Sequence, residues 1–511
     1  MNTNKKSSLA TIIGASSVGT MIEWYDFYIF GSLATIISTK FFPPGNPTAA
    51  FLSTLATFAA GFVVRPFGAL FFGRLGDLIG RKYTFMVTLL LMGGATFLIG
   101  CIPGYETIGF MAPVLILLLR LLQGLALGGE YGGAATYVAE HSPAEKRGFM
   151  TSWIQTTATV GLFVSLLVIM GTRNLLSKEA FDDWGWRVPF WVSIFMVIIS
   201  YLIRKNMEES PIFAKAKASG KTSTNPIKES FGHKFNFKFV LLALFGAVMG
   251  QGVIWYTGQF YAMSFLEKTM NIDKMQVDSL MFIALIMGTP FFLLFGWLSD
   301  KIGRKWIMMA GMLIAILSYR PIYEKMYQTT NVKNKQEVTE KAAILAELKE
   351  NKDKGMDSIY TVTKEFADGT KFKEIKKVTL ENGVAKIVDG KPKSESKITL
   401  NINSSDKWSL IWWVFIQVLF VTMVYGPIAA FLVELFPTKI RYTSMSLPYH
   451  IGNGVFGGLL PAVATYLATN AKKGGDAQWY LEGLWYPIGV AAVCLIIGVF
   501  YINAKDKEID D

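Results

Sequence analysis

Two carboxylates lie in the first long apolar segment of the chain, where charged groups are costly. Glu23 and Asp26 stand three residues apart, so a helix over residues 9–38 would place them on one face. A charge at the centre of a bilayer costs about 2.5–3.5 kcal/mol even on the lenient insertion scale, and two neighbouring carboxylates titrate as one coupled unit. The pair predicts a proton-carrying site. The alternative is a structural ion pair with Arg65 or Arg120.

A second polar sector runs along the apolar segment 110–138. At about 100° per residue, Arg120, Gln123, Glu130 and Tyr131 share one side of a helix. The guanidinium of Arg120 is a permanent cation that can form two parallel hydrogen bonds with a carboxylate. We therefore expect Arg120, Gln123 and Tyr131 to bind substrate and Glu130 to be a further proton-coupling group. The alternative is an internal pair of Arg120 with Glu130.

Amides and aromatic rings alternate in the apolar segment 238–264. Gln251, Trp255 and Gln259 recur at the spacing of one helical face, and Tyr256 follows Trp255. This pattern predicts the wall of a substrate-binding cavity, in which an ammonium group could lie over Trp255 or Tyr256. Anchoring in an interfacial aromatic belt is the alternative.

These groups belong to a strongly apolar chain. Of 511 residues, 52% are hydrophobic and only 17% are charged, against about 25% charged in soluble domains. Residues 322–407 hold 31 of the 88 charged residues. The composition argues against a soluble enzyme, a disordered regulator and a nucleic-acid-binding protein, and the net charge of +12 comes largely from short basic loops.

The apolar segments predict an all-α membrane protein with twelve transmembrane helices in two six-helix halves. With the N-terminus inside, inner loops and termini hold 22 Lys and Arg residues and short outer loops hold 7. This bias places both termini in the cytoplasm and the polar insert outside a bacterial inner membrane. The expected divisions are an N-terminal bundle 1–204, a cytoplasmic linker 205–237, a C-terminal bundle 238–503 interrupted by the insert 324–407, and a tail 504–511.

A ten-residue loop occurs twice, 223 residues apart. Gly-x-x-x-Asp-x-x-Gly-Arg-Lys stands at 73–82 and at 296–305, at the same place in each half. The repeat indicates a duplicated bundle, with a substrate site between the halves. We expect the Asp and Arg residues of these two loops to form a gate, together with Arg65 in the second span. The alternative is that the basic residues only follow the positive-inside rule and that each Asp caps a helix. The expected gating residues are Arg65, Asp77, Arg81, Asp300 and Arg304.

The paired loop resembles the signature of the major facilitator superfamily. Further segments resemble its metabolite:proton symporter branch, whose members take up organic acids or betaine-like solutes: residues 23–27, 65–68, 120–133, 186–190 and 209–213. The resemblance covers residues 9–320 and 408–503. It implies alternating access between two halves and leaves the substrate open.

The polar insert departs from that family pattern. Residues 334–351 show apolar spacing that predicts a short amphipathic helix. Strand-like runs follow at 358–364, 371–380, 384–388 and 397–403, separated by Asp-Gly or Asn-Gly turns. We expect a small α+β or β-rich domain. It could shield the extracellular mouth, capture substrate, dock an unknown partner, or have little effect on transport.

The sequence thus predicts a non-enzymatic transporter in the lipid bilayer. Our hypothesis is proton-coupled uptake of a small carboxylate or zwitterion by a monomer, without cofactor, metal or nucleic acid. A sugar or other neutral-solute porter is one alternative. A non-transporting receptor that uses the insert as its binding module is another.

Overall fold

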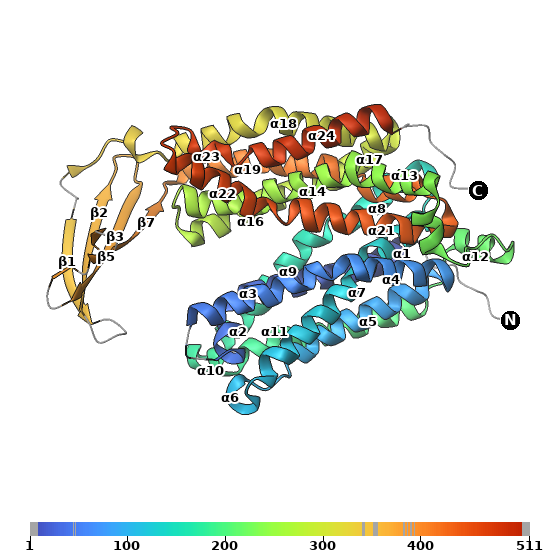
Figure 1. The fold of residues 1–511 in the computed structure, drawn as a ribbon, viewed down its shortest axis with the longest axis horizontal. Helices are drawn as coiled ribbons and strands as arrows, with labels where there is room; N and C mark the ends of the chain where they lie inside the picture. The colour runs from blue at the N-terminus through green and yellow to red at the C-terminus, as the bar shows by residue number, and fades with distance from the viewer. Residues whose placement is uncertain are drawn as a thin grey trace.

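The computed structural model describes residues 9–43, 45, 47–339, 343–350, 356–381, 384–385, 387–388, 391–392 and 394–502. Two helical halves lie side by side, and a sheet projects from one end of the second half (Figure 1). The first and last helices of the described chain, α1 at Leu9 and α24 at Tyr501, begin and end at the opposite end (Figure 1). We call these the insert end and the terminus end.

The first half is built from helices up to residue 205. Its helices are α1 (Leu9–Ser32), α2 (Ala34–Phe41), α3 (Pro47–Val63), α4 (Arg65–Leu78), α5 (Arg81–Ile99), α6 (Tyr105–Ile108), α7 (Met111–His141), α8 (Arg147–Gln155), α9 (Thr157–Leu175), α10 (Lys178–Asp183) and α11 (Val188–Lys205).

The second half follows a linker that contains a helix and a π-helical turn, α12 (Pro211–Ala218) and η3 (Lys228–Gly232). Its helices are α13 (Lys234–Ala243), α14 (Met249–Tyr256), α15 (Ala262–Ser264), α16 (Lys274–Gly288), α17 (Pro290–Ile302), α18 (Arg304–Thr329), α19 (Ser404–Tyr425), α20 (Ile428–Leu435), α21 (Arg441–Ile451), α22 (Leu460–Lys473), α23 (Trp479–Glu482) and α24 (Trp485–Tyr501). Short helical turns include η9 (Thr438–Ile440) and the π-helical η4 (Leu244–Val248), η5 (Thr257–Tyr261), η6 (Phe265–Thr269) and η10 (Gly452–Gly457).

Eleven helical segments of the described residues are long and apolar enough to cross a membrane. The first lies within residues 52–78 and the last spans Trp479–Tyr501. Helix α1 is the remaining segment that the sequence assigns to the bilayer. It packs along α9, α7 and α11, and it carries the buried carboxylates Glu23 and Asp26.

Close packing in the first half depends on small residues. A methyl group added at Gly128 of α7 would lie 2.2 Å from the carbonyl oxygen of Arg65, and one at Gly68 of α4 would lie 2.0 Å from that of Leu125. Helices α4 and α7 therefore touch backbone to backbone. Such contacts are typical of membrane helices, because lipid supplies no hydrophobic force that holds them together.

Gly128→Val should separate α4 from α7 and destabilise the first half by about 1–3 kcal/mol. The thermal unfolding midpoint of the purified protein in detergent is expected to fall. Gly94→Val in α5 is the matched control, because nothing lies within 4 Å of a methyl group at Gly94. Equal midpoints for the two variants would contradict the packing argument.

The insert consists of antiparallel strands in a five-stranded sheet and a separate two-stranded ribbon. Strands β1 (Ala343–Glu350), β2 (Met356–Glu365) and β3 (Lys371–Glu381) pair antiparallel in order, and β3 also pairs with β4 (Val384–Ala385) and β7 (Ser394–Asn401). Strands β5 (Ile387–Val388) and β6 (Lys391–Pro392) form a separate two-stranded ribbon. The strands expected at 358–364 and 371–380 are confirmed as β2 and β3, and β7 covers 397–401 of the strand expected at 397–403. The described residues of the strand expected at 384–388 form two short strands, β4 and β5, which belong to different sheets. Of the expected turns, 368–369 joins β2 to β3, and 382–383 and 389–390 lie outside the described residues.

Two sequence expectations near the insert are wrong. The segment expected as an amphipathic helix over 334–351 instead contributes β1, which pairs along its full length with β2, from Ala343 opposite Thr363 to Glu350 opposite Met356. An isolated short helix is marginal in water, whereas the ladder satisfies the backbone of both strands. The insert was also expected to begin at residue 324, but helix α18 continues to Thr329, with Met326 of its last turns buried.

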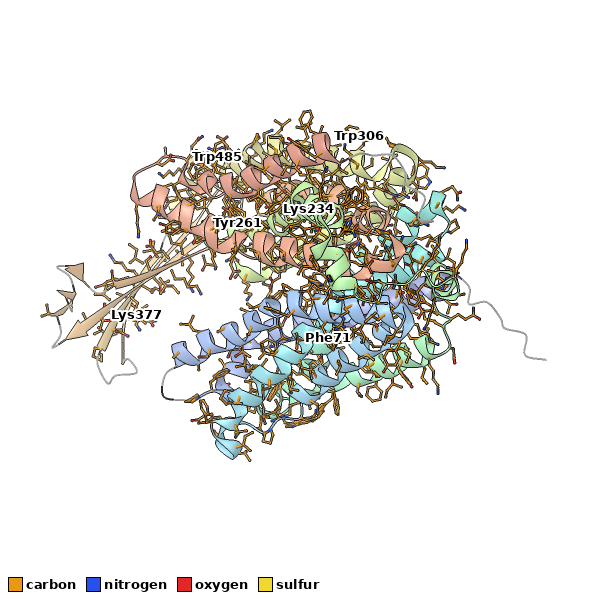
Figure 2. All side chains as sticks on the ribbon, turned by 45° about the vertical axis from the view of Figure 1, so that its right-hand side comes forward. Phe71, Lys234, Tyr261, Trp306, Lys377 and Trp485 are labelled. Atoms are coloured by element: carbon orange, nitrogen blue, oxygen red, sulfur yellow. The ribbon has the colours of Figure 1, made fainter. Side chains whose placement is uncertain are left out.

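The base of the insert is fixed to the second half by backbone pairing. The N–H of Leu400 donates to the carbonyl of Asn271 at 2.7 Å, and that of Asp273 donates to Leu400 at 2.9 Å. The side chain of Gln276 bonds both backbone groups of Ile402, at 3.0 and 2.8 Å. In Figure 2 the sheet, marked by Lys377, extends from the half that carries Tyr261 and Trp485.

One lysine joins the insert to the start of α19. The ammonium of Lys335 bonds Asp368 and Asp406, and Asn403 donates to the same two carboxylates. Burial lowers the pKa of Lys335, but the bonds to Asp368 and Asp406 outweigh this and raise its pKa above the ordinary value. Burial raises the pKa of Asp368, but the bond from Lys335 outweighs it and holds that pKa below the ordinary value. The contact of Lys335 with Asp368 and Asp406 is therefore most stable at pH values between the ordinary pKa of an aspartate and that of a lysine. It weakens when the pH falls through the lowered pKa of Asp368, and also when the pH rises through the raised pKa of Lys335.

Lys335→Met should loosen this joint without unfolding the helices. Removing the ammonium leaves two carboxylates close together, so amide exchange at Leu400 and Asp273 is expected to accelerate about tenfold at neutral pH. Hydrogen–deuterium exchange with mass spectrometry measures this. Lys397→Met, on the exposed part of β7, is the control, and equal exchange in both variants would contradict a role for Lys335 in the joint.

Candidate functional site

A small cavity of about 50 Å³ lies between the two halves near the middle of α1. Helices α1, α3 and α4 of the first half and α14, α19, α21 and η10 of the second contribute to its wall. Its lining residues are Glu23, Trp24, Phe27, Phe62, Arg65, Trp255, Tyr256, Tyr425, Tyr449, His450, Asn453 and Gly454.

The cavity contains one cation and one carboxylate, which face each other. A guanidinium nitrogen of Arg65 lies 3.5 Å from the carboxylate of Glu23, and the guanidinium also lies over the ring of Phe62, 4.3 Å from its centroid. Pro66 explains the position of Arg65. A proline removes a backbone donor and favours the first turn of a helix, so α3 ends at Val63 and α4 begins anew at Arg65. The sequence analysis placed Arg65 in the gate; the structure places it in the cavity.

Three of the residues that line this cavity each carry a buried polar atom with no hydrogen-bond partner among the described residues. These atoms are Nε of Arg65, Nε1 of Trp255 and Nε2 of His450. Buried polar groups are nearly always paired, and each unpaired one costs about 1–3 kcal/mol. Two of the three are N–H donors. Their convergence on one cavity indicates a place prepared for a polar guest that accepts hydrogen bonds.

Aromatic rings make up most of the remaining wall. Trp24 packs against Trp255 across the two halves, with ring centroids 5.2 Å apart. The ring of Tyr449 stacks on Tyr131 at 3.7 Å, and its hydroxyl lies 2.7 Å from that of Tyr425. The faces of such rings attract cations. The cavity wall therefore combines hydrogen-bond donors with the faces of aromatic rings.

Asp26 lies beside the cavity in a separate buried network. Its carboxylate accepts from Arg120 at 2.8 Å and from Gln123 at 2.9 Å, and Gln123 also donates to Thr96 at 2.7 Å. Arg120 lies over the ring of Phe30. The structure thus brings Arg120 and Gln123 to Asp26 and leaves both out of the cavity wall. The alternative named for Arg120, a pair with Glu130, does not form, because Arg120 pairs with Asp26 and Glu130 with Arg204.

Glu130 is also held away from the cavity. One carboxylate oxygen accepts from Arg204 at 2.8 Å and the other from Thr88 at 2.8 Å. Arg204 in turn lies over the ring of Phe85 and donates to its carbonyl at 2.7 Å. This pair links α7 to α5 and α11. Both oxygens are satisfied, so the arrangement resembles a structural ion pair more than a site that exchanges protons.

Of the other expected binding residues, some line the cavity and some contact residues that line it. Trp255 and Tyr256 line the cavity. Gln251 exchanges hydrogen bonds with the lining residue Asn453 at 3.1 and 3.2 Å, and Tyr131 supports Tyr449 while accepting from Gln155 at 2.9 Å. Gln259 lies in the π-helical η5, is 9% exposed and is not a lining residue.

The two repeated loops meet the opposite half in a reciprocal way at the terminus end. Asp77 of α4 accepts from the backbone N–H groups of Tyr442 and Thr443, at 3.3 and 2.8 Å, where α21 begins. Asp300 of α17 accepts from the N–H groups of Gly148 and Phe149, both at 2.8 Å, where α8 begins. Each half therefore caps a helix of the other. Carboxylates suit this place, because the first N–H groups of a helix lack partners and carry partial positive charge.

The arginine that follows each aspartate strengthens its contact. Arg81 pairs with Asp77 at 2.9 Å and donates to the carbonyl of Thr438 in the second half at 2.7 Å. Arg304 pairs with Asp300 at 2.7 Å and with Glu434 at 3.1 Å. The glycine before each arginine, Gly80 or Gly303, has a positive φ of 134° or 102°, a conformation that glycine adopts without strain.

We call the contacts that join the two halves at the terminus end the closure. Four charged residues of the closure are not among the residues predicted from the sequence. Glu140 pairs with Arg441 at 2.8 Å, and Glu434 pairs with Arg147 at 3.2 Å. Both pairs join the first half to the second. A signal was present in the sequence, since Glu-x-x-Pro-x-x-x-Arg stands both at 140–147 and at 434–441.

Comparisons with known proteins agree with this architecture. The sequence matches the family described as "Sugar (and other) transporter" over residues 11–346. It is 31% identical to a putative metabolite transport protein of Haemophilus influenzae, over 99% of this chain and 96% of that protein. It is 36% identical to the proline/betaine transporter of Salmonella typhimurium, over 59% of this chain and 62% of that protein. Among solved structures, the proton:xylose symporter XylE bound to a bromodeoxyglucose superposes with a TM-score of 0.67 at 14% identity, covering 98% of each chain.

Proposed function

The chain belongs to the sugar (and other) transporter family of the major facilitator superfamily, and from this premise we propose that it couples a proton to the uptake of a small carboxylate or zwitterion. It is a multi-pass transporter of small solutes in a bacterial inner membrane and not an enzyme. The observation that carries the proposal is the set of side chains around the cavity between the halves, where Arg65 and two unpaired polar atoms lie among aromatic rings. At about 50 Å³ this cavity is smaller than the roughly 300–1,000 Å³ of typical ligand sites, so we expect it to widen when a solute enters.

The hydrogen-bond donors of the cavity wall suit a carboxylate. Arg65 supplies charge and an unpaired Nε donor, and Trp255 supplies a second donor. Buried carboxylates need charge-assisted hydrogen bonds of this kind. The rings of Trp24, Tyr256 and Tyr449 suit a cationic ammonium at the other end of the same molecule. A zwitterion would engage both the donors and the rings, in keeping with the proline/betaine transporter among the relatives.

Glu23 is our choice for the proton carrier. It is the one carboxylate among the lining residues, and its partner is the cation that a substrate carboxylate would need. Protonation of Glu23 would free Arg65 for that carboxylate. A substrate anion and a proton together then leave the net charge of the cavity unchanged, which limits the desolvation penalty. Asp26 and Glu130 have arginine partners outside the cavity, so we expect them to support the site.

Transport would proceed by alternating access. The helix caps at Asp77 and Asp300 hold the halves together at the terminus end, and the helices lie further apart at the insert end (Figure 1). We propose that this is the outward-facing state, with both termini cytoplasmic, the insert outside and α1 as the twelfth span. We expect one copy of the chain to suffice, with no metal or cofactor.

Uptake into proteoliposomes tests the proposal. Purified protein should accumulate radiolabelled betaine, proline or a small dicarboxylate when the lumen is alkaline, and a protonophore should abolish accumulation. Counterflow with the same panel plus xylose then ranks the substrates. Equal uptake with and without the proton gradient would contradict coupling, and a preference for xylose over every acid and zwitterion would contradict the substrate class.

A further inference from the structure

A second, much larger cavity lies at the terminus end, outside the proposed substrate site. It has a volume of about 930 Å³ and opens between the linker and the second half. Residues of α12 and the following turn form one wall, the start of α13 forms another, and Pro437, Thr438 and Lys439 at η9 complete it. Ligand cavities are typically about 300–1,000 Å³, so a medium-sized molecule fits.

The lining of this cavity is basic. Lys215, Lys221 and Lys439 contribute three ammonium groups, and His233 lies beside them. The one lining carboxylate, Glu229, is already engaged, since it accepts from Ser223 at 2.6 Å and pairs with Lys439 at 3.4 Å. Lysine is a point charge that binds phosphate well and needs no fixed bidentate geometry. Because Glu229 offsets one of the three lysine charges, the lining carries a net charge of +2 (3 Lys − 1 Glu), which suits a multiply charged phosphate compound.

The walls of the cavity belong to both halves. Helix α12 is tied to the first half, because the ring of Phe213 lies under the guanidinium of Arg81 at 4.4 Å and Ser210 donates to Glu140. Lys439 lies next to Thr438, whose carbonyl accepts from Arg81 across the closure. A rearrangement that separates the halves here would move Lys439 away from Lys215 and Lys221. The complete set of cations therefore exists only while the terminus end is closed.

We propose that this cavity binds a phosphate-bearing anion, either a soluble polyphosphate compound or an anionic phospholipid headgroup, and that binding favours the state closed at the terminus end. The conformational effect follows from linkage, because a ligand stabilises the state that contains its site. This second part rests on the proposed transport cycle. The binding itself does not.

Binding is tested first, without any transport assay. Inorganic tripolyphosphate is titrated into detergent-purified protein by calorimetry, and nanodiscs with and without phosphatidylglycerol provide the lipid arm, read as thermal stabilisation. Lys215→Gln/Lys221→Gln/Lys439→Gln should weaken binding by at least about tenfold. Lys205→Gln/Lys217→Gln/Lys228→Gln removes the same charge from exposed positions outside the lining and should bind like the wild type.

The two arms separate the sources of the anion. Saturable binding of tripolyphosphate in detergent identifies a soluble ligand, and a selective response to phosphatidylglycerol alone identifies a headgroup. No response in either arm, or equal loss in the two triple variants, overturns the site.

The conformational part is read with spin labels on Arg74→Cys and Lys301→Cys, two exposed positions at the terminus end of the two halves, with the exposed Cys101 replaced by serine. The bound anion should increase the population with the shorter label distance. An unchanged distance distribution at saturation overturns the link to closure.

Discussion

Glu23→Gln is expected to abolish proton-driven accumulation of substrate while leaving exchange of substrate across the membrane. Glutamine fills the same volume and cannot release a proton, and it leaves Arg65 without the charged partner that lies 3.5 Å away. The cavity then resembles its protonated, substrate-ready form at every pH. The rate of uptake against a gradient should fall by about 100-fold or more, which corresponds to about 2.7 kcal/mol of activation free energy. Counterflow should stay within about threefold of wild type.

The pH dependence separates this role from simple damage to the site. Wild-type uptake should vary with external pH, and counterflow by Glu23→Gln should not. Glu130→Gln is the matched control, because Glu130 is an equally buried carboxylate with its own arginine, Arg204, outside the cavity. It should lower thermal stability and keep proton-driven accumulation. Accumulation by Glu23→Gln, or its selective loss in Glu130→Gln, would transfer the proton to another group.

Asp77→Asn is expected to depress uptake about tenfold or more while the protein still reaches the membrane. The carboxylate accepts two backbone N–H bonds and the Thr443 hydroxyl across the closure, in addition to its pair with Arg81. Hydrogen bonds to charged groups are worth about 1.5–3 kcal/mol each. An asparagine presents one oxygen and a donor to the same N–H groups, so the closed terminus end loses stability relative to the open one.

The reciprocal contact gives this prediction an internal comparison. Asp300→Asn removes the same kind of cap from the other half, at Gly148 and Phe149, and should depress uptake in the same direction. Asp183→Asn, whose side chain is 79% exposed, should have no effect. Surface biotinylation normalises each uptake rate to the amount of protein. Wild-type uptake by Asp77→Asn would remove the closure from the transport cycle.

Sequence reasoning went furthest where residues recur. The paired loops identified Asp77 and Asp300 because the same residues occupy the same place in each half. The structure adds what each one contacts, namely the start of a helix in the opposite half. Trp255 and Tyr256 could likewise be proposed as cavity residues, because aromatic rings beside amides are unusual in an apolar span.

The choice between Arg65 and Arg120 was beyond the sequence. A helical projection shows that Arg120 shares a sector with Tyr131, but the neighbouring helices decide whether that sector faces the cavity. Here Asp26 of α1 holds Arg120 at 2.8 Å, while the break before Pro66 turns Arg65 toward Glu23. The strand β1 was missed for a similar reason, since its partner β2 lies later in the chain.

The attachment of the insert to the second half breaks the near-symmetry of the two bundles. Leu400 and Ile402 of the insert hydrogen-bond Asn271, Asp273 and Gln276 of the second half. The sheet should therefore rotate together with the second half as one rigid body. Strand β1 stands furthest from the helices (Figure 1), so a small tilt near the substrate cavity becomes a large displacement there. In cryo-electron microscopy the sheet would serve as an alignment landmark outside the detergent belt. A binding protein that clamps the sheet to the first half would arrest the cycle without touching the substrate cavity.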